Sequence, residues 1–181
     1  IGLGYVGLPL AAEFGKHLDT IGFDINRSRV KELTEGIDHT QELSSTEIFA
    51  SVKLRFTCDE TDIIGANVYI VTVPTPITDS FQPDLKKIEK ASELLGRSIQ
   101  KNAVVIFEST VYPGCTEEIC IPIIERVSGL EFNRDFFAGY SPERINPGDK
   151  LRRITNIVKV TSGSTPEAAD FSNLLMEVLV F

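Results

Sequence analysis

The chain has 181 residues, of which 42% are hydrophobic and 24% charged, and its 26 acidic and 18 basic side chains give a formal net charge of -8. One globular domain is expected at this length. The excess of acids argues against nucleic acid as the principal partner, because duplex binding rests on Lys and Arg that neutralise phosphates. The three cysteines match no metal pair, and no apolar run is long enough to cross a membrane, so we expect a protein of the reducing cytoplasm with no metal and no membrane partner.

Short apolar, β-branched runs alternate with amphipathic stretches along the chain, which is typical of βαβ units in a parallel sheet. Asn26 and Thr165 occupy helix N-cap positions, and Pro122 should kink or shorten its helix. The fold class predicted is therefore α/β, with a doubly wound parallel sheet. The predicted elements, in chain order, are helix 8–16, strand 20–24, helices 27–35 and 46–52, strands 54–57 and 68–73, helix 84–100, strand 103–107, helix 116–127, strands 136–140 and 157–160, and helix 166–179.

The two ends of the chain suggest a piece of something longer. The sequence starts at Ile1, directly before a glycine motif and with almost none of the strand that usually precedes one, and it stops at Phe181 inside an apolar run. We therefore expect residues 1–181 to form one domain that is trimmed at both ends.

The motif Gly2-Leu3-Gly4-Tyr5-Val6-Gly7 fits G-x-G-x-x-G and leads into the first predicted helix. Its glycines would allow a tight turn, close approach of a pyrophosphate and packing of helix on strand, and the helix N-terminus would attract the phosphates. Asp24 ends the next strand at the spacing of an acid that binds both ribose hydroxyls, which favours NAD over NADP. Arg27 and Arg29 lie close enough to weaken that preference. The alternative is a glycine turn with an N-capping aspartate.

Three further segments follow predicted strands, at the edge where doubly wound sheets bind ligands. They are Val73-Pro74-Thr75-Pro76, the segment from Glu108 to Gly114, and the segment Ser141-Pro142-Glu143-Arg144-Ile145-Asn146-Pro147-Gly148. Together with the glycine motif, these segments resemble the signature loops of the UDP-glucose/GDP-mannose dehydrogenase family over essentially the whole chain.

The resemblance implies a Rossmann domain that binds NAD in an enzyme that oxidises the carbon-6 alcohol of a nucleotide sugar to a carboxylate by two hydride transfers. It also implies a central region that forms a homodimer and a C-terminal nucleotide-sugar domain, both beyond this chain. The family's nucleophilic cysteine, in a Gly-Gly-x-Cys motif, and its helper lysine would lie there too. We therefore assign no catalytic role to Cys58, Cys115 or Cys120, and expect Cys115 to be a small packed side chain.

The same resemblance assigns roles to individual residues. Thr110 would bind the catalytic water or reacting oxygen, and Glu143 would assist hydrolysis of a thioester intermediate. The alternatives are a strand-end cap for Thr110 and a solvated loop acid for Glu143. Arg144 would bind the acetamido group or a phosphate of the substrate, or else form a surface ion pair. The cofactor-binding candidates are Gly2, Gly4, Tyr5, Val6, Gly7, Asp24, Arg29, Thr75 and Thr110.

The segment that starts at Glu143-Arg144 is similar to the branch of the family that acts on UDP-N-acetylhexosamines, whereas the enzymes for UDP-glucose and GDP-mannose typically carry Phe-Leu after the glutamate. This resemblance directs the substrate prediction to UDP-N-acetylglucosamine or UDP-N-acetylgalactosamine. The product would be a uronic acid for a surface polysaccharide, and the sequence does not decide between the epimers. Three alternatives stay open, namely a UDP-glucose 6-dehydrogenase, a β-hydroxyacid dehydrogenase of the 6-phosphogluconate type, and a non-catalytic module that senses NAD.

Overall fold

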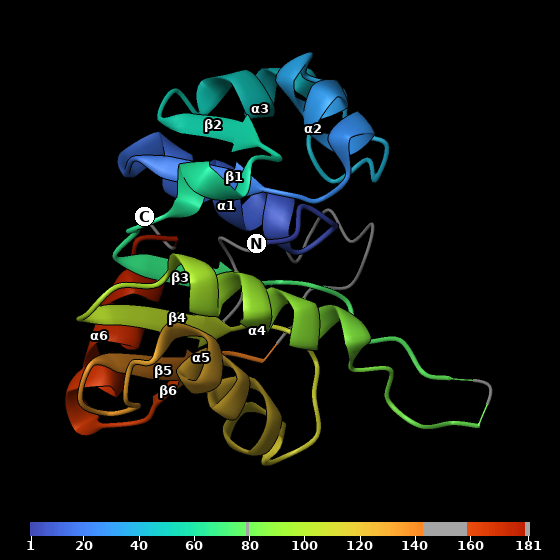
Figure 1. Ribbon diagram of the computed structural model, residues 1–181. Coiled ribbons are helices and arrows are strands. Elements are labelled where there is room, and N and C mark those ends of the chain that lie inside the picture. The colour runs from blue at the N-terminus through green and yellow to red at the C-terminus, as the bar shows by residue number, and fades with distance from the viewer. Residues whose placement is uncertain (79, 143–158, 180–181) are drawn as a thin grey trace.

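The computed structural model describes residues 1–78, 80–142 and 159–179, and strands alternate with helices over most of this length (Figure 1). The helices are α1 (Gly7–His17), α2 (Arg27–Thr34), α3 (Ser45–Ala50), α4 (Lys86–Ser98), α5 (Ile121–Ser128) and α6 (Pro166–Glu177), with a 3-10 turn η1 (Glu60–Ile63) and a π-helical turn η2 (Thr116–Cys120). The strands are β1 (Thr20–Phe23), β2 (Leu54–Thr57), β3 (Val68–Val71), β4 (Ala103–Phe107), β5 (Phe136–Tyr140) and β6 (Ser162–Gly163).

Two groups of strands are joined by the first residues of the chain. β1 pairs with β2 in parallel, and β3, β4 and β5 pair in parallel in that order. Residues 1–2 lie between the groups, because Gly2 donates its N–H to the Phe23 carbonyl of β1 and the Ile1 carbonyl accepts from Thr72 at the end of β3. The lateral order is therefore β2, β1, residues 1–2, β3, β4, β5, β6.

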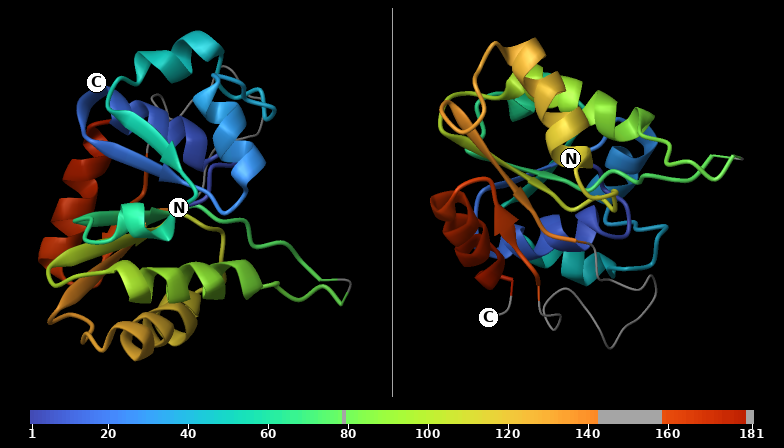
Figure 2. Two further views of the ribbon diagram at one scale, coloured as in Figure 1. Left: turned by 45° about the horizontal axis from the view of Figure 1, so that its top comes forward. Right: turned by 90° about the horizontal axis from the view of Figure 1, so that it is seen from below.

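Helices cover both faces of the sheet. The buried side chains of α4 and α5 pack on one face of β3, β4 and β5. On the opposite face, Leu10 and Phe14 of α1 and Met176 of α6 pack against Val104 and Ile106 of β4. The right view of Figure 2 shows α4 and α5 on one side of the strands and α1 and α6 on the other. The predicted doubly wound α/β fold is thus confirmed.

The predicted boundaries hold to within about two residues for most elements, because the capping residues were visible in the sequence. Asn26 accepts hydrogen bonds from the N–H groups of Ser28 and Arg29, and Thr165 accepts from Ala168. The helix predicted at 116–127 begins instead as the π turn η2 and becomes α-helical at Ile121, with Pro122 in its first turn. Within the described ranges, no helix is long and apolar enough to span a bilayer.

The strand predicted at 157–160 is wrong where the structure describes it. Lys159 and Val160 have no strand geometry, and residues 157–158 lie outside the described residues. The pairing comes later and runs in the opposite direction, because Ser162 and Gly163 form β6 antiparallel to the end of β5. A short β-branched run predicts a buried strand here, but Val160 is 52% exposed and the Lys159 side chain turns inward to an ion pair.

Candidate functional site

The three glycines of the glycine loop have different structural roles. Gly2 has a φ of 94°, which L side chains rarely adopt. A β-carbon on Gly7 would lie 1.8 Å from the Gly2 carbonyl oxygen and 2.4 Å from Thr72 Oγ1, so α1 can start this close to the strand only with glycine there. A β-carbon on Gly4 would have no neighbouring atom within 4 Å, so the Gly4 α-carbon faces open space. A ligand can therefore approach the backbone at Gly4.

The N-terminus of α1 is open to a ligand. Its N-cap residue, Val6, provides no side-chain hydrogen bond, and the first turn contains no acidic residue. The first N–H groups of a helix lack partners within it, and the helix dipole adds partial positive charge there. Gly4, Tyr5 and Val6 line a cavity of about 260 Å³ at this helix end. An anion can be held there by backbone groups.

Two loops close the other side of the same cavity, and each donates a hydroxyl to the other. The Ser109 hydroxyl, after β4, donates to the Val73 carbonyl at 2.6 Å. The Thr75 hydroxyl, after β3, donates to the carbonyl of Thr110. Because β3 and β4 are parallel neighbours, their carboxyl ends bring these loops together, and the reciprocal bonds fix their relative position. Thr75 and Thr110 both line the cavity.

Asp24 holds the glycine loop to the end of β1. One carboxylate oxygen accepts the Leu3 N–H at 2.8 Å, and the other accepts the Asn26 N–H at 2.8 Å. Each oxygen has a second lone pair, so the carboxylate can still accept from hydroxyl groups of a ligand. Asp24 is half-buried and follows the strand directly, which places an acceptor beside the glycine turn.

Arg29 lies beneath the loop rather than in the cavity. Its side chain is 4% exposed, its Nε donates to the Leu3 carbonyl at 2.9 Å, and one terminal nitrogen donates to Asp38 at 2.7 Å. The Leu3 peptide group is therefore held from both sides, by Asp24 on its N–H and by Arg29 on its carbonyl. Arg29 contacts the candidate site through the backbone of the loop.

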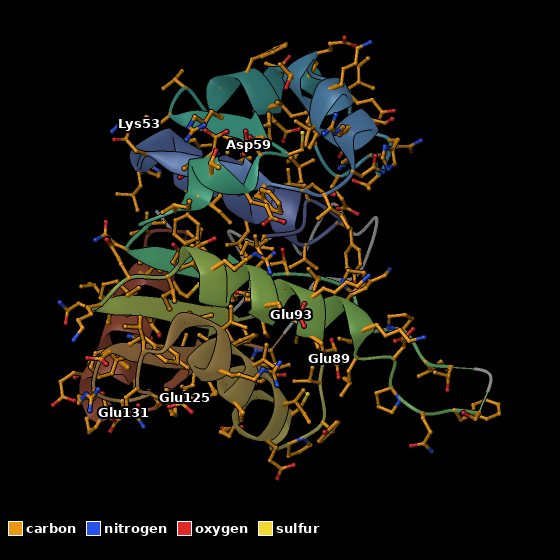
Figure 3. The ribbon with its side chains drawn as sticks, viewed as in Figure 1. Lys53, Asp59, Glu89, Glu93, Glu125 and Glu131 are labelled. Atoms are coloured by element: carbon orange, nitrogen blue, oxygen red, sulfur yellow. The ribbon has the colours of Figure 1, made fainter. Side chains whose placement is uncertain are left out.

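Glu108 is the one carboxylate among the described residues that line the cavity. Its side chain is buried, and Lys159 Nζ lies 2.5 Å from Oε2 with its own side chain also buried. This ion pair joins the end of β4 to the segment that precedes β6. Other acids lie elsewhere, such as Glu89 and Glu93 on α4 and Glu125 on α5 (Figure 3).

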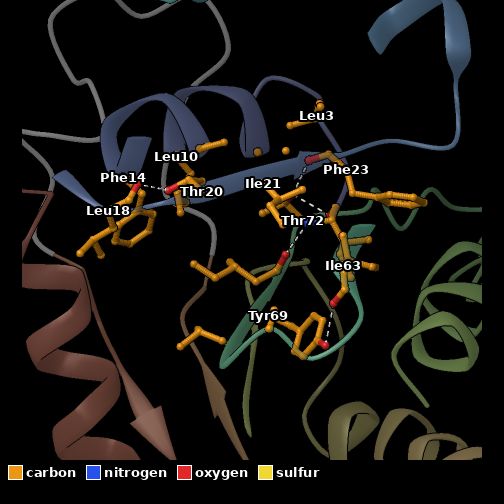
Figure 4. Close-up of a pocket in the computed structure, with 18 of the residues that line it drawn as sticks. Leu3, Leu10, Phe14, Leu18, Thr20, Ile21, Phe23, Ile63, Tyr69 and Thr72 are labelled. Carbon is orange, nitrogen blue, oxygen red and sulfur yellow. Dashed lines mark hydrogen bonds between the residues drawn. The ribbon is translucent and has the colours of Figure 1, made fainter. Parts of the chain in front are cut away.

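A larger cavity of about 360 Å³ lies between β1 and β3, next to Ile1. Figure 4 shows that its labelled lining is mainly apolar, with Phe14 from α1, Ile21 from β1 and Tyr69 from β3. It extends toward the amino ends of these strands, where Thr20 and Val68 lie. Ligands of doubly wound sheets bind at the carboxyl ends, so we place the functional site in the smaller cavity.

The structure brings most of the predicted cofactor residues together. Gly4, Tyr5, Val6, Thr75 and Thr110 line one cavity, Gly2 and Gly7 shape its turn, and Asp24 holds the loop from β1. Glu143 and Arg144 lie outside the described residues. In the described part of the chain, no cluster of His, Cys, Asp or Glu could hold a metal ion.

Two residues that support the candidate site were not predicted from the sequence. Thr72 donates its hydroxyl to the Gly2 carbonyl at 2.7 Å, and its position at the end of β3 could have indicated it. Asp38 supports Arg29, but no short motif links residues nine positions apart in this way.

A parallel sheet with helices on both faces, a glycine turn leading into a helix and an acid at the end of the next strand define a Rossmann dinucleotide-binding domain. Residues 1–179 match the profile described as "UDP-glucose/GDP-mannose dehydrogenase family, NAD binding domain". The chain belongs to that family, and its cofactor is NAD. The predicted family, fold and cofactor are confirmed.

Named relatives agree with this assignment. The chain is 56% identical over 180 residues to a UDP-N-acetyl-D-glucosamine 6-dehydrogenase of Pseudomonas aeruginosa, a match that covers 99% of this chain and 43% of that protein. It is 52% identical to the enzyme of the same name from Salmonella typhi, of which it covers 42%. The structure of a UDP-D-ManNAc dehydrogenase from Pyrococcus horikoshii superimposes with a TM-score of 0.90 at 32% identity, over 99% of this chain and 44% of that one. The chain thus spans less than half the length of these relatives.

Proposed function

We propose that the protein is an NAD-dependent UDP-N-acetylhexosamine 6-dehydrogenase, with UDP-N-acetylglucosamine as its substrate, and that residues 1–181 are its cofactor-binding domain. The observation that carries the proposal is the 56% identity to an enzyme of that name, along 99% of the chain. The cavity between the α1 N-terminus and the loops after β3 and β4 supports it with a geometry suited to a dinucleotide.

The residues of the cavity fit NAD. The open α-carbon of Gly4 leaves room for the pyrophosphate, and the uncapped start of α1 offers it N–H groups. Asp24 accepts the ribose hydroxyls, and its negative charge disfavours a 2′-phosphate. When bound, NAD supplies a hydride acceptor. The residues of this chain position the bound NAD. The two loops joined through Thr75 and Ser109 cover one side of the cofactor and exclude water from it.

The catalytic assignments are part of the proposal. Thr110 is exposed at the rim of the cavity, and its hydroxyl is a donor that could orient a water molecule or the reacting oxygen. Glu143 would accept a proton from water in the hydrolytic step, and Arg144 would bind the acetamido carbonyl or a phosphate. Both roles rest on the Ser-Pro-Glu-Arg sequence, which begins where the Ser141 N–H donates to the Phe107 carbonyl of β4.

The remaining features of the whole protein are also proposals. We expect a nucleotide-sugar domain, a region that forms a homodimer, and the nucleophilic cysteine and helper lysine in parts of the protein that this chain does not contain. We also propose a cytoplasmic location and a role in surface polysaccharide synthesis. A protein named CapL from Staphylococcus aureus, 48% identical over 170 residues, supports the second point by its name.

A substrate panel tests the activity. The full-length protein is assayed for NAD reduction with UDP-N-acetylglucosamine, UDP-N-acetylgalactosamine, UDP-glucose, GDP-mannose and, as a β-hydroxyacid, 6-phosphogluconate. The highest kcat/KM is expected with UDP-N-acetylglucosamine. Preference for UDP-glucose would support the first alternative, and turnover of a β-hydroxyacid alone would support the second. Binding of NAD without turnover of any of these compounds would support a sensing module.

A further inference from the structure

We propose that Asp38 is a positioning and specificity residue that acts through Arg29, and that it strengthens the preference for NAD over NADP beyond the effect of Asp24. The inference deepens the proposed function, on whose NAD-binding part it rests. Asp38 lies in the loop after α2, nine residues beyond Arg29 and outside the residues that line the cavity. Its effect on the cofactor must therefore be indirect.

Asp38 is the centre of a buried network. Its side chain is fully buried, and it accepts hydrogen bonds from the N–H and hydroxyl of Thr40, from the N–H groups of Glu42 and Leu43, and from Arg29. Burial alone would raise the pKa of Asp38, but the hydrogen bonds from Thr40, Leu43 and Arg29 outweigh it and hold the pKa below its usual value. Asp38 is therefore a fixed anion at neutral pH.

This anion fixes the guanidinium of Arg29. The Arg29–Asp38 bond is 2.7 Å long, and both side chains are almost completely buried. The remaining Arg29 nitrogens are also directed, with Nε on the Leu3 carbonyl at 2.9 Å and the other terminal nitrogen 3.2 Å from His39 Nδ1. A planar guanidinium held at both ends cannot turn toward a new ligand without breaking one of these contacts.

The position of Arg29 bears on cofactor choice because only the Leu3 peptide group separates it from Asp24, the predicted ribose-binding residue. Leu3 donates its N–H to Asp24 and accepts from Arg29 on its carbonyl. Dinucleotide sites that accept NADP place an arginine on the 2′-phosphate, and Arg29 is close to where that phosphate would be. In this chain Asp38 keeps Arg29 beneath the loop, so the guanidinium supports the loop and is withheld from a phosphate. Asp24 and Asp38 together also leave a net negative charge around the ribose.

Calorimetric binding of NAD and NADP to the full-length protein tests this inference without requiring turnover. In Asp38→Asn, NAD affinity should fall about tenfold, because the loop loses a charge-assisted support. The ratio of Kd for NADP to Kd for NAD should fall at least about tenfold as well, because Arg29 becomes free to bind the 2′-phosphate. In the double variant Asp38→Asn/Arg29→Gln the ratio should return to that of the parent.

Two further variants make the result decisive. Asp135→Asn removes a carboxylate that is likewise buried and paired with an arginine, but it lies before the amino end of β5, away from the glycine loop, and it should change neither constant. If Asp38→Asn does not fold, Arg29→Lys serves instead. A flexible ammonium does not reproduce the planar fork that bonds both Leu3 and Asp38, so NAD affinity should fall about tenfold.

An unchanged ratio in Asp38→Asn, a lowered ratio that persists in the double variant, or unchanged NAD affinity in Arg29→Lys would overturn the inference. A parent protein that binds NAD but oxidises no nucleotide sugar would contradict the proposed activity and leave this inference standing. A parent that does not bind NAD would overturn both.

Discussion

The α-carbon of Gly7 faces the carbonyl oxygen of Gly2 so closely that a β-carbon at Gly7 would lie 1.8 Å from that oxygen. This nearest atom belongs to the backbone, which cannot move aside as a flexible side chain would. At Gly4, three residues earlier, a β-carbon would have no atom within 4 Å. One loop therefore contains a glycine needed for the fold and a glycine that faces the ligand.

This difference predicts opposite phenotypes for two similar substitutions. Gly7→Ala should lower the free energy of unfolding by about 2 kcal/mol or more, because the first turn of α1 must shift away from Gly2. Gly4→Ala should change it by less than about 0.5 kcal/mol but weaken NAD binding, because its methyl group points to the space left for the pyrophosphate. Urea unfolding and calorimetry measure the two effects. Equal stability of the two variants would contradict the assignment.

Loss of Lys159 should destabilise the domain strongly. Lys159→Met keeps the length of the side chain but removes the cation that lies on the buried Glu108 carboxylate, which should cost about 3 kcal/mol of unfolding free energy. Lys31→Met is the matched control, because Lys31 is exposed and its pairing with Glu35 spans 3.9 Å, and it should cost less than about 0.5 kcal/mol. Similar values for both variants in urea unfolding would refute a structural role for the buried pair.

Asp135 should make stability depend on pH in the acid range. Hydrogen bonds from Arg134, from the Glu131 N–H and from Lys101 hold the pKa of Asp135 well below its usual value. A carboxyl group with a lowered pKa in the folded state stabilises the fold above its unfolded pKa of about 3.9, and this stability is lost as the pH falls toward the folded pKa. Unfolding free energies measured from about pH 6 to about pH 2 should therefore fall less steeply in Asp135→Asn. If the unfolding free energy depended on pH in the same way in Asp135→Asn and in the parent, the contacts of Asp135 would not stabilise the fold in solution.

The cysteines should differ in reactivity in the folded protein. Cys115 and Cys120 are fully buried, and burial raises the pKa of Cys115 and raises that of Cys120 to about 12, whereas Cys58 is partly exposed. At about pH 8, iodoacetamide should modify Cys58 first, and the other two only after unfolding, as peptide mass spectrometry would show. Modification of Cys115 at the rate of Cys58 in folded protein would contradict the packing around η2.

Most of the fold could be predicted because its signals are local. The glycine motif, the Asn26 cap and the helical spacing of apolar residues in α4 each depend on neighbours within a few positions. The meeting of the candidate-site loops was also predictable, because loops that follow parallel strands lie at one edge of the sheet.

The errors and omissions come from contacts between distant segments. The strand predicted at 157–160 failed because Lys159 pairs with Glu108, 51 positions earlier, and no periodicity contains that information. The ion pair between Arg29 and Asp38 could not be predicted for the same reason. The sequence shows that Arg29 is close to Asp24, but it does not show that the Arg29 guanidinium is buried and bound to Asp38. Short turns such as η1 are too brief to give a period.

The number of NADH molecules formed for each molecule of UDP-N-acetylglucosamine consumed tests the central claim most directly. Oxidation of an alcohol to a carboxylate removes four electrons, and each NAD accepts two. The full-length protein, allowed to exhaust a limiting amount of the sugar, should therefore form two NADH per sugar and release the uronic acid. One NADH per sugar, as in a simple alcohol dehydrogenase, or none would contradict the proposal that this NAD-binding domain serves a 6-dehydrogenase.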